Sequence, residues 1–201
     1  SVLTAFGVDR VCRFAFDYAL AHPPLGGRPL VTSVDKANVL RSYAFWRRHF
    51  DAVAQEYGDR VDASRIYVDA FCAHLVLAPQ KVHVAVAENM FGDIVSDLGG
   101  AVAGSLGLAP SGDIGDVHGV FQSAHGSAPD IAGQGVANPV ATILSAVMLL
   151  EWLGLGEMAA DIERAVAESL TDGASRTADV GGTAGTQAAA QAVIAALRGP
   201  A

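Results

Sequence analysis

Two hydrophobic periods alternate along the first half of the chain, and this alternation is the strongest constraint on its fold. Apolar residues recur at helical spacing over 11–18 and over 46–57. Short apolar or β-branched runs bounded by turn residues lie between and after these helices, at Leu30–Val34, Arg65–Val68 and Val82–Ala87. Because such runs form strands, and strands that alternate with helices pack as a covered sheet, the pattern predicts an α/β fold with a layered sheet.

The pattern changes after Gly99-Gly100. Residues 104–119 are rich in Gly, Pro, Ser and Asp, and this composition predicts a loop. Three helices are predicted beyond it, at 138–153, 157–170 and 185–197, the first of them opened by an Asn-Pro pair and closed by a glycine. We therefore expect a domain boundary near residue 103, with domains at 1–103 and 104–201.

Composition narrows the possible partners. The 201 residues are 51% hydrophobic and carry a net charge of −8, which argues against nucleic acid or an anionic membrane as the main partner. Cys12 and Cys72 have apolar neighbours and no metal-ligand spacing, so they are expected to be core residues in a reducing, cytoplasmic compartment. The longest apolar stretch, Val140–Leu150, is interrupted by polar residues and is too short for a bilayer.

Three aspartates are candidate metal ligands. If a helix opens at Gly92, Asp93 and Asp97 lie four residues apart on one face of it, close to the end of a buried strand. Asp69 ends another predicted strand and can supply a third oxygen. Paired carboxylates favour a hard cation, so the pattern points to Mg²⁺ or Mn²⁺. The alternative is that Asp93 caps its helix and Asp97 is solvated.

Lys36 follows a predicted strand and is a candidate proton-transfer group. A lysine that is partly desolvated and close to a metal has a lowered pKa, which lets it pass protons near neutral pH. The alternative is an ordinary solvated lysine at a strand end.

A loop of small residues over 125–139 is a candidate cofactor site. Its glycines allow the backbone to approach a ligand closely and to donate N–H groups. Asp130 can accept hydrogen bonds from both ribose hydroxyls and would repel a 2′-phosphate, which favours NAD over NADP. The chain has neither the Rossmann nor the P-loop glycine pattern, and an ordinary surface loop is the alternative.

Taken together, these segments resemble the β-decarboxylating dehydrogenases of the isocitrate/isopropylmalate dehydrogenase family. Two motifs are long and specific: Asn-x-Phe-Gly-Asp-Ile-x-Ser-Asp at 89–97 and His-Gly-Ser-Ala-Pro-Asp-Ile-Ala-Gly at 125–133. The other matching stretches follow the family order along nearly the whole chain; they are 4–11, 34–40, 67–70 and 179–182.

The resemblance implies a mechanism and a site. Asp93 and Asp97, with Asp69 from the partner subunit of a homodimer, would hold Mg²⁺ or Mn²⁺, which binds a small 2-hydroxy acid. NAD would take the hydride, CO₂ would leave, and Lys36, also reaching across the dimer, would handle the hydroxyl proton. The residues implied for the adenosine half of NAD are His125, Gly126, Ser127, Ala128, Pro129, Asp130, Ile131, Ala132, Gly133 and Asn138.

The resemblance also implies domain roles and a substrate. Domain 1–103 would carry the metal, the substrate and the dimer contact, and 104–201 would be the C-terminal part of the NAD-binding domain. The leading substrate is 3-isopropylmalate, of leucine biosynthesis, with tartrate, D-malate or homoisocitrate as alternatives.

Two departures from the family favour a different reading, that of a catalytically impaired or non-catalytic member. The family's N-terminal segment, which supplies the first strands, the substrate-binding arginines and a catalytic tyrosine, is absent from this chain. Gln122 also stands where the family usually has a glutamate.

Overall fold

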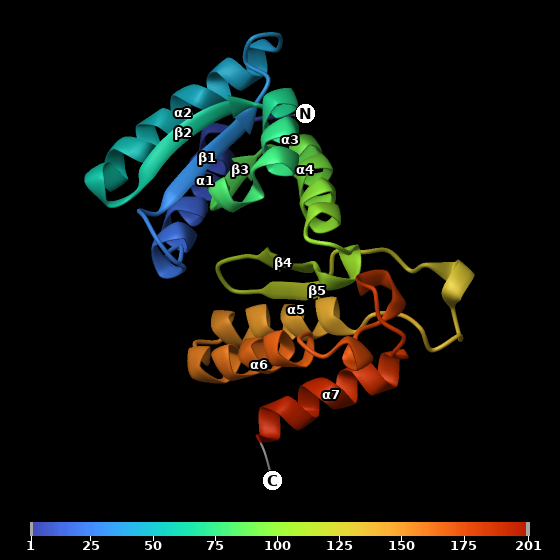
Figure 1. Ribbon diagram of the computed structural model, residues 1–201. Coiled ribbons are helices and arrows are strands. Elements are labelled where there is room, and N and C mark those ends of the chain that lie inside the picture. The colour runs from blue at the N-terminus through green and yellow to red at the C-terminus, as the bar shows by residue number, and fades with distance from the viewer. Residues whose placement is uncertain (1, 200–201) are drawn as a thin grey trace. The chain divides into compact units, whose positions relative to one another are not determined.

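The first half of the chain is built around a parallel sheet, and the computed structural model describes residues 2–199 (Figure 1). Strand β1 (Leu30–Asp35) lies between β2 (Asp62–Tyr67) and β3 (Val84–Ala87) in a sheet of order β2-β1-β3. Residues 31–35 are all buried, as a central strand covered on both faces requires. In the register with β2, Asp35 of β1 pairs with Tyr67.

Contacts between residues divide the chain into two compact units, Ser1–Val102 (unit 1) and Ala103–Ala201 (unit 2). Over its described residues, unit 1 holds the parallel sheet and four α-helices. These are α1 (Ala5–Ala21), α2 (Arg41–Tyr57), α3 (Val68–Leu77) and α4 (Asn89–Val102). The roles proposed for domains 1–103 and 104–201 stay predictions.

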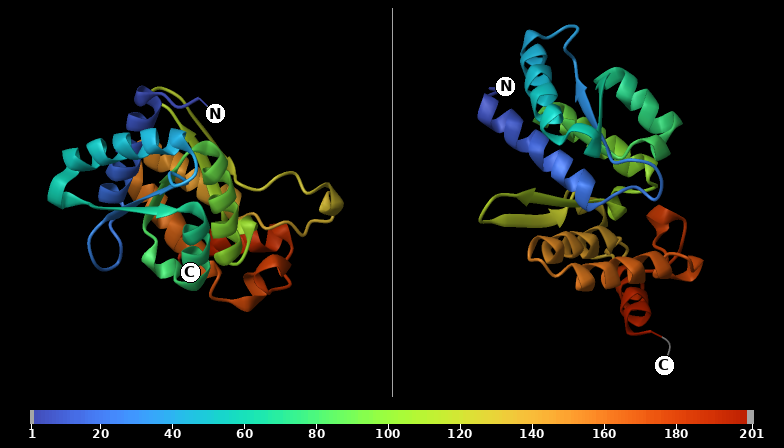
Figure 2. Two further views of the ribbon diagram at one scale, coloured as in Figure 1. Left: turned by 90° about the horizontal axis from the view of Figure 1, so that it is seen from above. Right: turned by 90° about the vertical axis from the view of Figure 1, so that its left-hand side faces the viewer.

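The alternation of side chains along β1 decides which helices cover which face. Val31 packs in a core cluster with residues of α1 and α2, among them Phe16 and Phe50. Val34, on the opposite face of the strand, packs with Phe71 of α3 and Val95 of α4. Helices α1 and α2 also lie side by side in both views of Figure 2.

Buried polar contacts fix α2 against the sheet. Trp46 Nε1 donates to Ser33 Oγ of β1 at 2.9 Å. Tyr43 Oη donates to Glu88 Oε2 at 2.8 Å, and both side chains are buried. Burial, together with the hydrogen bond to Glu88, raises the pKa of Tyr43, so its hydroxyl stays a donor. Glu88 directly precedes α4, so this contact also fixes the start of that helix.

Unit 2 is a hairpin covered by helices. Strands β4 (Pro110–Ile114) and β5 (Gly119–Ser123) pair antiparallel, and α5 (Val140–Trp152) packs on both. Ser145 Oγ of α5 donates to the Gln122 carbonyl at 2.6 Å. The remaining helices are α6 (Gly156–Ser169) and α7 (Thr186–Arg198).

Short 3₁₀ turns connect the larger elements in both units. They are η1 (Gly58–Arg60), η2 (Pro79–Lys81), η3 (Leu106–Leu108), η4 (Pro129–Ile131), η5 (Gly173–Ser175) and η6 (Ala178–Val180).

The α/β class, the three strands of unit 1 and the helices predicted after residue 138 are confirmed, within a few residues at their ends. Three local predictions were wrong. Residues 104–119 contain β4 as well as loop, because pairing with β5 overrides the weak strand preference of Ser, Gly and Asp. Helix α4 begins at Asn89 rather than Gly92, since the Glu88 carbonyl already accepts from Gly92 N. Asp69 lies in the first turn of α3, not at a strand end.

Within residues 2–199, no helix combines the length and the apolar character needed to cross a membrane.

The Tyr43–Glu88 contact predicts a measurable loss of stability. Tyr43→Phe removes the donor and leaves a buried carboxylate without it, which should cost about 1 to 3 kcal/mol of unfolding free energy. Urea unfolding of the full-length protein checks this, with Ser42→Ala, an exposed change in the same helix, as control. Equal stability of the two variants would contradict the role given to this contact.

Candidate functional site

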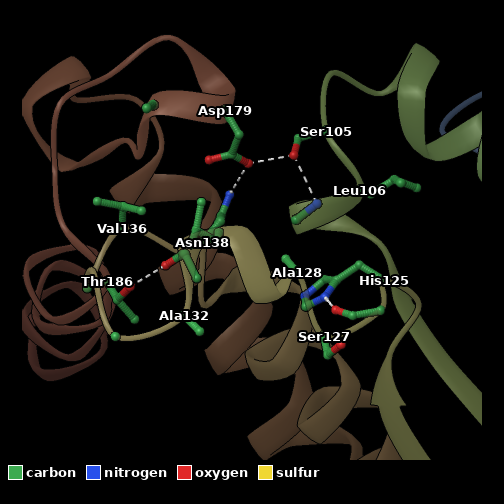
Figure 3. Close-up of a pocket in the computed structure, with 17 residues that line it drawn as sticks. Ser105, Leu106, His125, Ser127, Ala128, Ala132, Val136, Asn138, Asp179 and Thr186 are labelled. Carbon is green, nitrogen blue, oxygen red and sulfur yellow. Dashed lines mark hydrogen bonds between the residues drawn. The ribbon is translucent and has the colours of Figure 1, made fainter.

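A cavity of about 660 Å³ lies within unit 2, bordered by segments that are far apart in the sequence (Figure 3). Its walls come from 105–107, from the loop 125–138, from the turn at Ala178 and Asp179, and from Thr186 at the start of α7. The volume falls within the range of roughly 300 to 1,000 Å³ that is typical of small-molecule sites. The cavity is therefore a candidate ligand site.

The loop 125–138 has an unusual backbone conformation, and hydrogen bonds hold its C-terminal end. It extends away from the helices of unit 2 and appears in yellow in Figures 1 and 2. Ala128 adopts a left-handed conformation with φ 41° and ψ 63°, which a side chain disfavours and which is common at functional loops. Thr186 ties the loop back to α7, since its Oγ1 donates to the Ala137 carbonyl at 2.5 Å and its backbone N to Gly135 O at 2.8 Å.

A polar cluster around Asp179 holds one side of the cavity together. Asp179 Oδ2 accepts from Ser105 Oγ at 2.5 Å and from Asn138 Nδ2 at 3.0 Å, and Oδ1 accepts from Thr177 Oγ1 at 2.5 Å. Asn138 Oδ1 in turn accepts from Val140 N at 3.0 Å, at the start of α5. The orientation of the Asn138 amide is thus fixed at both of its ends.

These contacts also decide the charge of Asp179. Its partial burial works to raise its pKa, but the hydrogen bonds from Ser105, Thr177 and Asn138 outweigh burial and hold the pKa below its usual value. The carboxylate therefore stays ionised at neutral pH. Its contribution to stability is present above the usual aspartate range and is lost as the pH falls through the lowered pKa.

Gly107 is required by close approach rather than by backbone conformation. A Cβ on Gly107 would lie 2.7 Å from Asp179 Oδ2 and 2.8 Å from Asn138 Cβ. Either contact would push the Asp179 cluster (Ser105, Asn138, Thr177 and Asp179) apart.

The structure brings most of the predicted cofactor residues to one cavity. All of them line it except Pro129 and Asp130, which lie in η4 beside it. Reasoning from the sequence missed several lining residues, namely Ser105, Leu106, Gly107, Gly135, Val136, Ala137, Ala178, Asp179 and Thr186. Asp179 could have been found, because it opens one of the family-like stretches, 179–182.

Lys36 and Asp69 meet within a single chain of unit 1. Lys36 Nζ lies 2.5 Å from Asp69 Oδ1, and the side chains are 24% and 67% exposed. The hydrogen bond from Lys36 is the main reason that the pKa of Asp69 is lowered. Asp69 is therefore an ionised and accessible carboxylate, as a metal ligand must be.

Asp93 and Asp97 are both exposed on α4, while Phe91 and Val95 of the same helix are buried. Among residues 2–199, no group of three or more His, Cys, Asp or Glu side chains is close enough to hold a metal ion. The chemistry of Asp69, Asp93 and Asp97 suits a hard cation, but one chain does not assemble them into a site. Their predicted union across two subunits stays a prediction.

Comparisons with known proteins give one consistent family. Residues 1–197 match the family described as isocitrate/isopropylmalate dehydrogenase. The 3-isopropylmalate/3-methylmalate dehydrogenase of Methanocaldococcus jannaschii is 44% identical over 98% of this chain and 59% of that protein. The 3-isopropylmalate dehydrogenase of Anaeromyxobacter dehalogenans is 47% identical over 96% of this chain and 53% of that protein.

Solved structures agree with the sequence relatives. The isocitrate dehydrogenase of Methylococcus capsulatus superposes with a TM-score of 0.91 at 39% identity, covering 98% of this chain and 58% of that one. A β-decarboxylating dehydrogenase of Thermococcus kodakarensis gives 0.86 at 41% identity, covering 98% and 56%. The chain thus spans little more than half the length of these relatives.

The close approach at Gly107 can be tested without a ligand. Gly107→Ala should lower the unfolding free energy of the full-length protein by about 1 to 3 kcal/mol, because the added methyl group overpacks the Asp179 cluster. Gly156→Ala is the matched control, since a Cβ at this helical position meets nothing within 4 Å. It should leave stability unchanged or raised. A Gly107→Ala protein as stable as the control would show that the cluster tolerates displacement.

Proposed function

We propose, because the chain belongs to the isocitrate/isopropylmalate dehydrogenase family, that the protein carrying it catalyses NAD- and divalent-metal-dependent oxidative decarboxylation of a 3-substituted malate. The best candidate substrate is 3-isopropylmalate, since several of the relatives at 44 to 48% identity carry that name.

The Lys36–Asp69 ion pair is the observation that carries the proposed reaction. It sets an amine, which can take the proton of a substrate hydroxyl, 2.5 Å from a carboxylate that can hold a cation. A divalent cation bound there would act as a Lewis acid on the substrate oxygens. In its neutral form Lys36 would take the hydroxyl proton, while Asp69 would orient the amine and share in binding the cation.

The cavity of unit 2 supports the proposed cofactor. NAD would accept the hydride, with its adenosine half in the cavity. The loop glycines 126 and 133 let the backbone approach that half closely, and Asn138 presents a fixed amide to it. Asp130 is exposed in η4 at the edge of the cavity, where its charge would disfavour a 2′-phosphate.

A homodimer is part of the proposal, because the metal ligands do not meet within one chain. Asp93 and Asp97 of one subunit would join Lys36 and Asp69 of the other. Helices α3 and α4 carry large exposed apolar side chains that a second copy can cover. They are Val76, Leu77, Met90 and Ile94, exposed by 56%, 82%, 50% and 53%.

One observation favours a second candidate function, a family member that binds ligands without turnover. Gln122 replaces the glutamate usual in the family, and its side chain is exposed on β5. The presence of Lys36 together with Asp69, Asp93 and Asp97 counts against this candidate, because a subunit without chemistry has no need for this lysine beside these proposed metal ligands.

The proposed reaction is tested by turnover. With Mn²⁺ and NAD, the full-length protein should form NADH with 3-isopropylmalate, and at lower kcat/KM with D-malate, tartrate, isocitrate or homoisocitrate. Replacing NAD by NADP should lower the rate, because of Asp130. NADH formed fastest from another member of the set would replace the substrate, and no NADH from any of them would favour the non-catalytic candidate.

The assignment of the metal ligands is tested by binding. Asp97→Asn should weaken Mn²⁺ binding to the full-length protein about 10-fold or more, since a charged ligand becomes neutral. Titration calorimetry or Mn²⁺ paramagnetic resonance measures this directly, with Asp116→Asn, an exposed change in unit 2, as control. Unchanged Mn²⁺ affinity would mean that Asp97 is not a ligand.

A further inference from the structure

Asp35 is a fully buried carboxylate at the carboxyl end of β1, with two partners. Its side chain is 0% exposed. Asp35 Oδ2 accepts from Arg47 Nε of α2 at 2.5 Å, and Oδ1 accepts from the backbone N of Ala37 at 2.8 Å. A buried charge needs such partners, because the cost of removing it from water is several kcal/mol.

One of the two contacts of Asp35 encloses Lys36 in a fixed turn. The bond to Ala37 N spans Lys36 and forms the turn in which an aspartate side chain binds the backbone two residues later. The Lys36 carbonyl also accepts from Val39 N and Leu40 N, both at 3.0 Å. The backbone of Lys36 is therefore held on both sides, and Arg47 holds the Asp35 side chain from α2.

The side chain of Lys36 is guided by Tyr67, the last residue of β2. The Arg47 guanidinium carbon lies 4.8 Å from the centroid of the Tyr67 ring, and Lys36 Nζ lies 5.8 Å from it. Tyr67 pairs with Asp35 in the sheet, so the ring stands beside the turn. Asp69, two residues further along, then receives Lys36 Nζ.

We propose that Asp35, Arg47 and Tyr67 form a brace that positions Lys36 for proton transfer. This inference rests on the role given to Lys36 in the proposed function. The three are positioning residues, since they act through Lys36. A buried ion pair adds little net stability compared with apolar packing, so its main effect here is geometric. It fixes the turn that points Lys36 toward Asp69.

Arg47 carries its charge in the folded protein. The hydrogen bond with Asp35 is the largest cause that raises the pKa of Arg47, and the charge of Asp35 adds to it. The planar guanidinium can bind Asp35 through Nε and still lie against the Tyr67 ring. A lysine ammonium has no such plane, so Arg47→Lys keeps the charge but loses the second contact.

A double-mutant cycle in the full-length protein tests the brace. Arg47→Lys should lower kcat about 10-fold while Mn²⁺ affinity and the KM for the hydroxy acid stay within about twofold. In a Lys36→Met background, the same substitution should change the residual kcat by less than about twofold, because its effect passes through Lys36. Equal loss in both backgrounds would overturn the proposal and indicate a general structural effect.

Two further variants serve as a control and as a second test of the brace. Arg65→Lys is the matched control. Arg65 of β2 likewise pairs through its Nε with an aspartate, Asp51 of α2, at 2.5 Å. It should leave kcat unchanged. Tyr67→Leu leaves the buried pair intact and should show the same dependence on Lys36, so a folding defect of Arg47→Lys would not end the test. Losses from Tyr67→Leu that are independent of Lys36 would count against the brace.

Amide hydrogen exchange separates this inference from the proposed function. Arg47→Lys should speed exchange at Ala37 N about 10-fold, while buried amides of α1 exchange at the same rate as before. This readout needs no turnover. An inactive wild-type protein would overturn the proposed function, and the exchange rate at Ala37 would then decide the brace alone. Unchanged exchange at Ala37 would overturn the brace, and so would an additive cycle.

Discussion

Unit 1 depends on the burial of β1 on both faces. A strand with two covered faces must send alternate side chains into two different cores, and here Val31 and Val34 do so. Ser33 and Asp35 follow Val31 toward α2, and both are polar and fully buried. Each therefore needs a partner from α2, and Trp46 and Arg47 provide one each. The position of α2 is thus set by the hydrogen-bonding needs of one strand as well as by apolar contact.

The two units solve a similar problem in different ways. In both, one aspartate collects donors from segments distant in sequence and thereby orders a loop with candidate chemistry. Asp35 is buried and answered by a full positive charge, while Asp179 is more exposed and is answered by two hydroxyls and an amide. The arrangement around Asp179 avoids the desolvation cost of an ion pair. It requires a glycine at position 107, because a side chain there would collide with Asp179 and Asn138.

Local patterns in the sequence predicted most of the helices and the strands of the parallel sheet, and the motifs predicted many of the residues that line the cavity. Hydrophobic period gave the three strands of the sheet, and end signals gave the last three helices. Strand β4 was missed because Ser, Gly and Asp have a weak strand preference and the strand forms by pairing with β5. The Asp179 cluster joins residues separated by 41 and 74 positions, which no local pattern encodes. The contact of Lys36 with Asp69 was equally hidden, because it follows from the pairing of β1 with β2.

That pairing has a consequence for which parts of the chain can change length. Asp35 and Tyr67 are opposite one another at the ends of their strands, and Lys36 and Asp69 stand one and two residues beyond. An added or deleted residue after either strand would break this alignment, as would a one-residue slip between them. The segments that enter the strands, 22–29 and 58–61, bear no such constraint. Insertions and deletions are therefore compatible with this alignment before β1 and β2, but not directly after them.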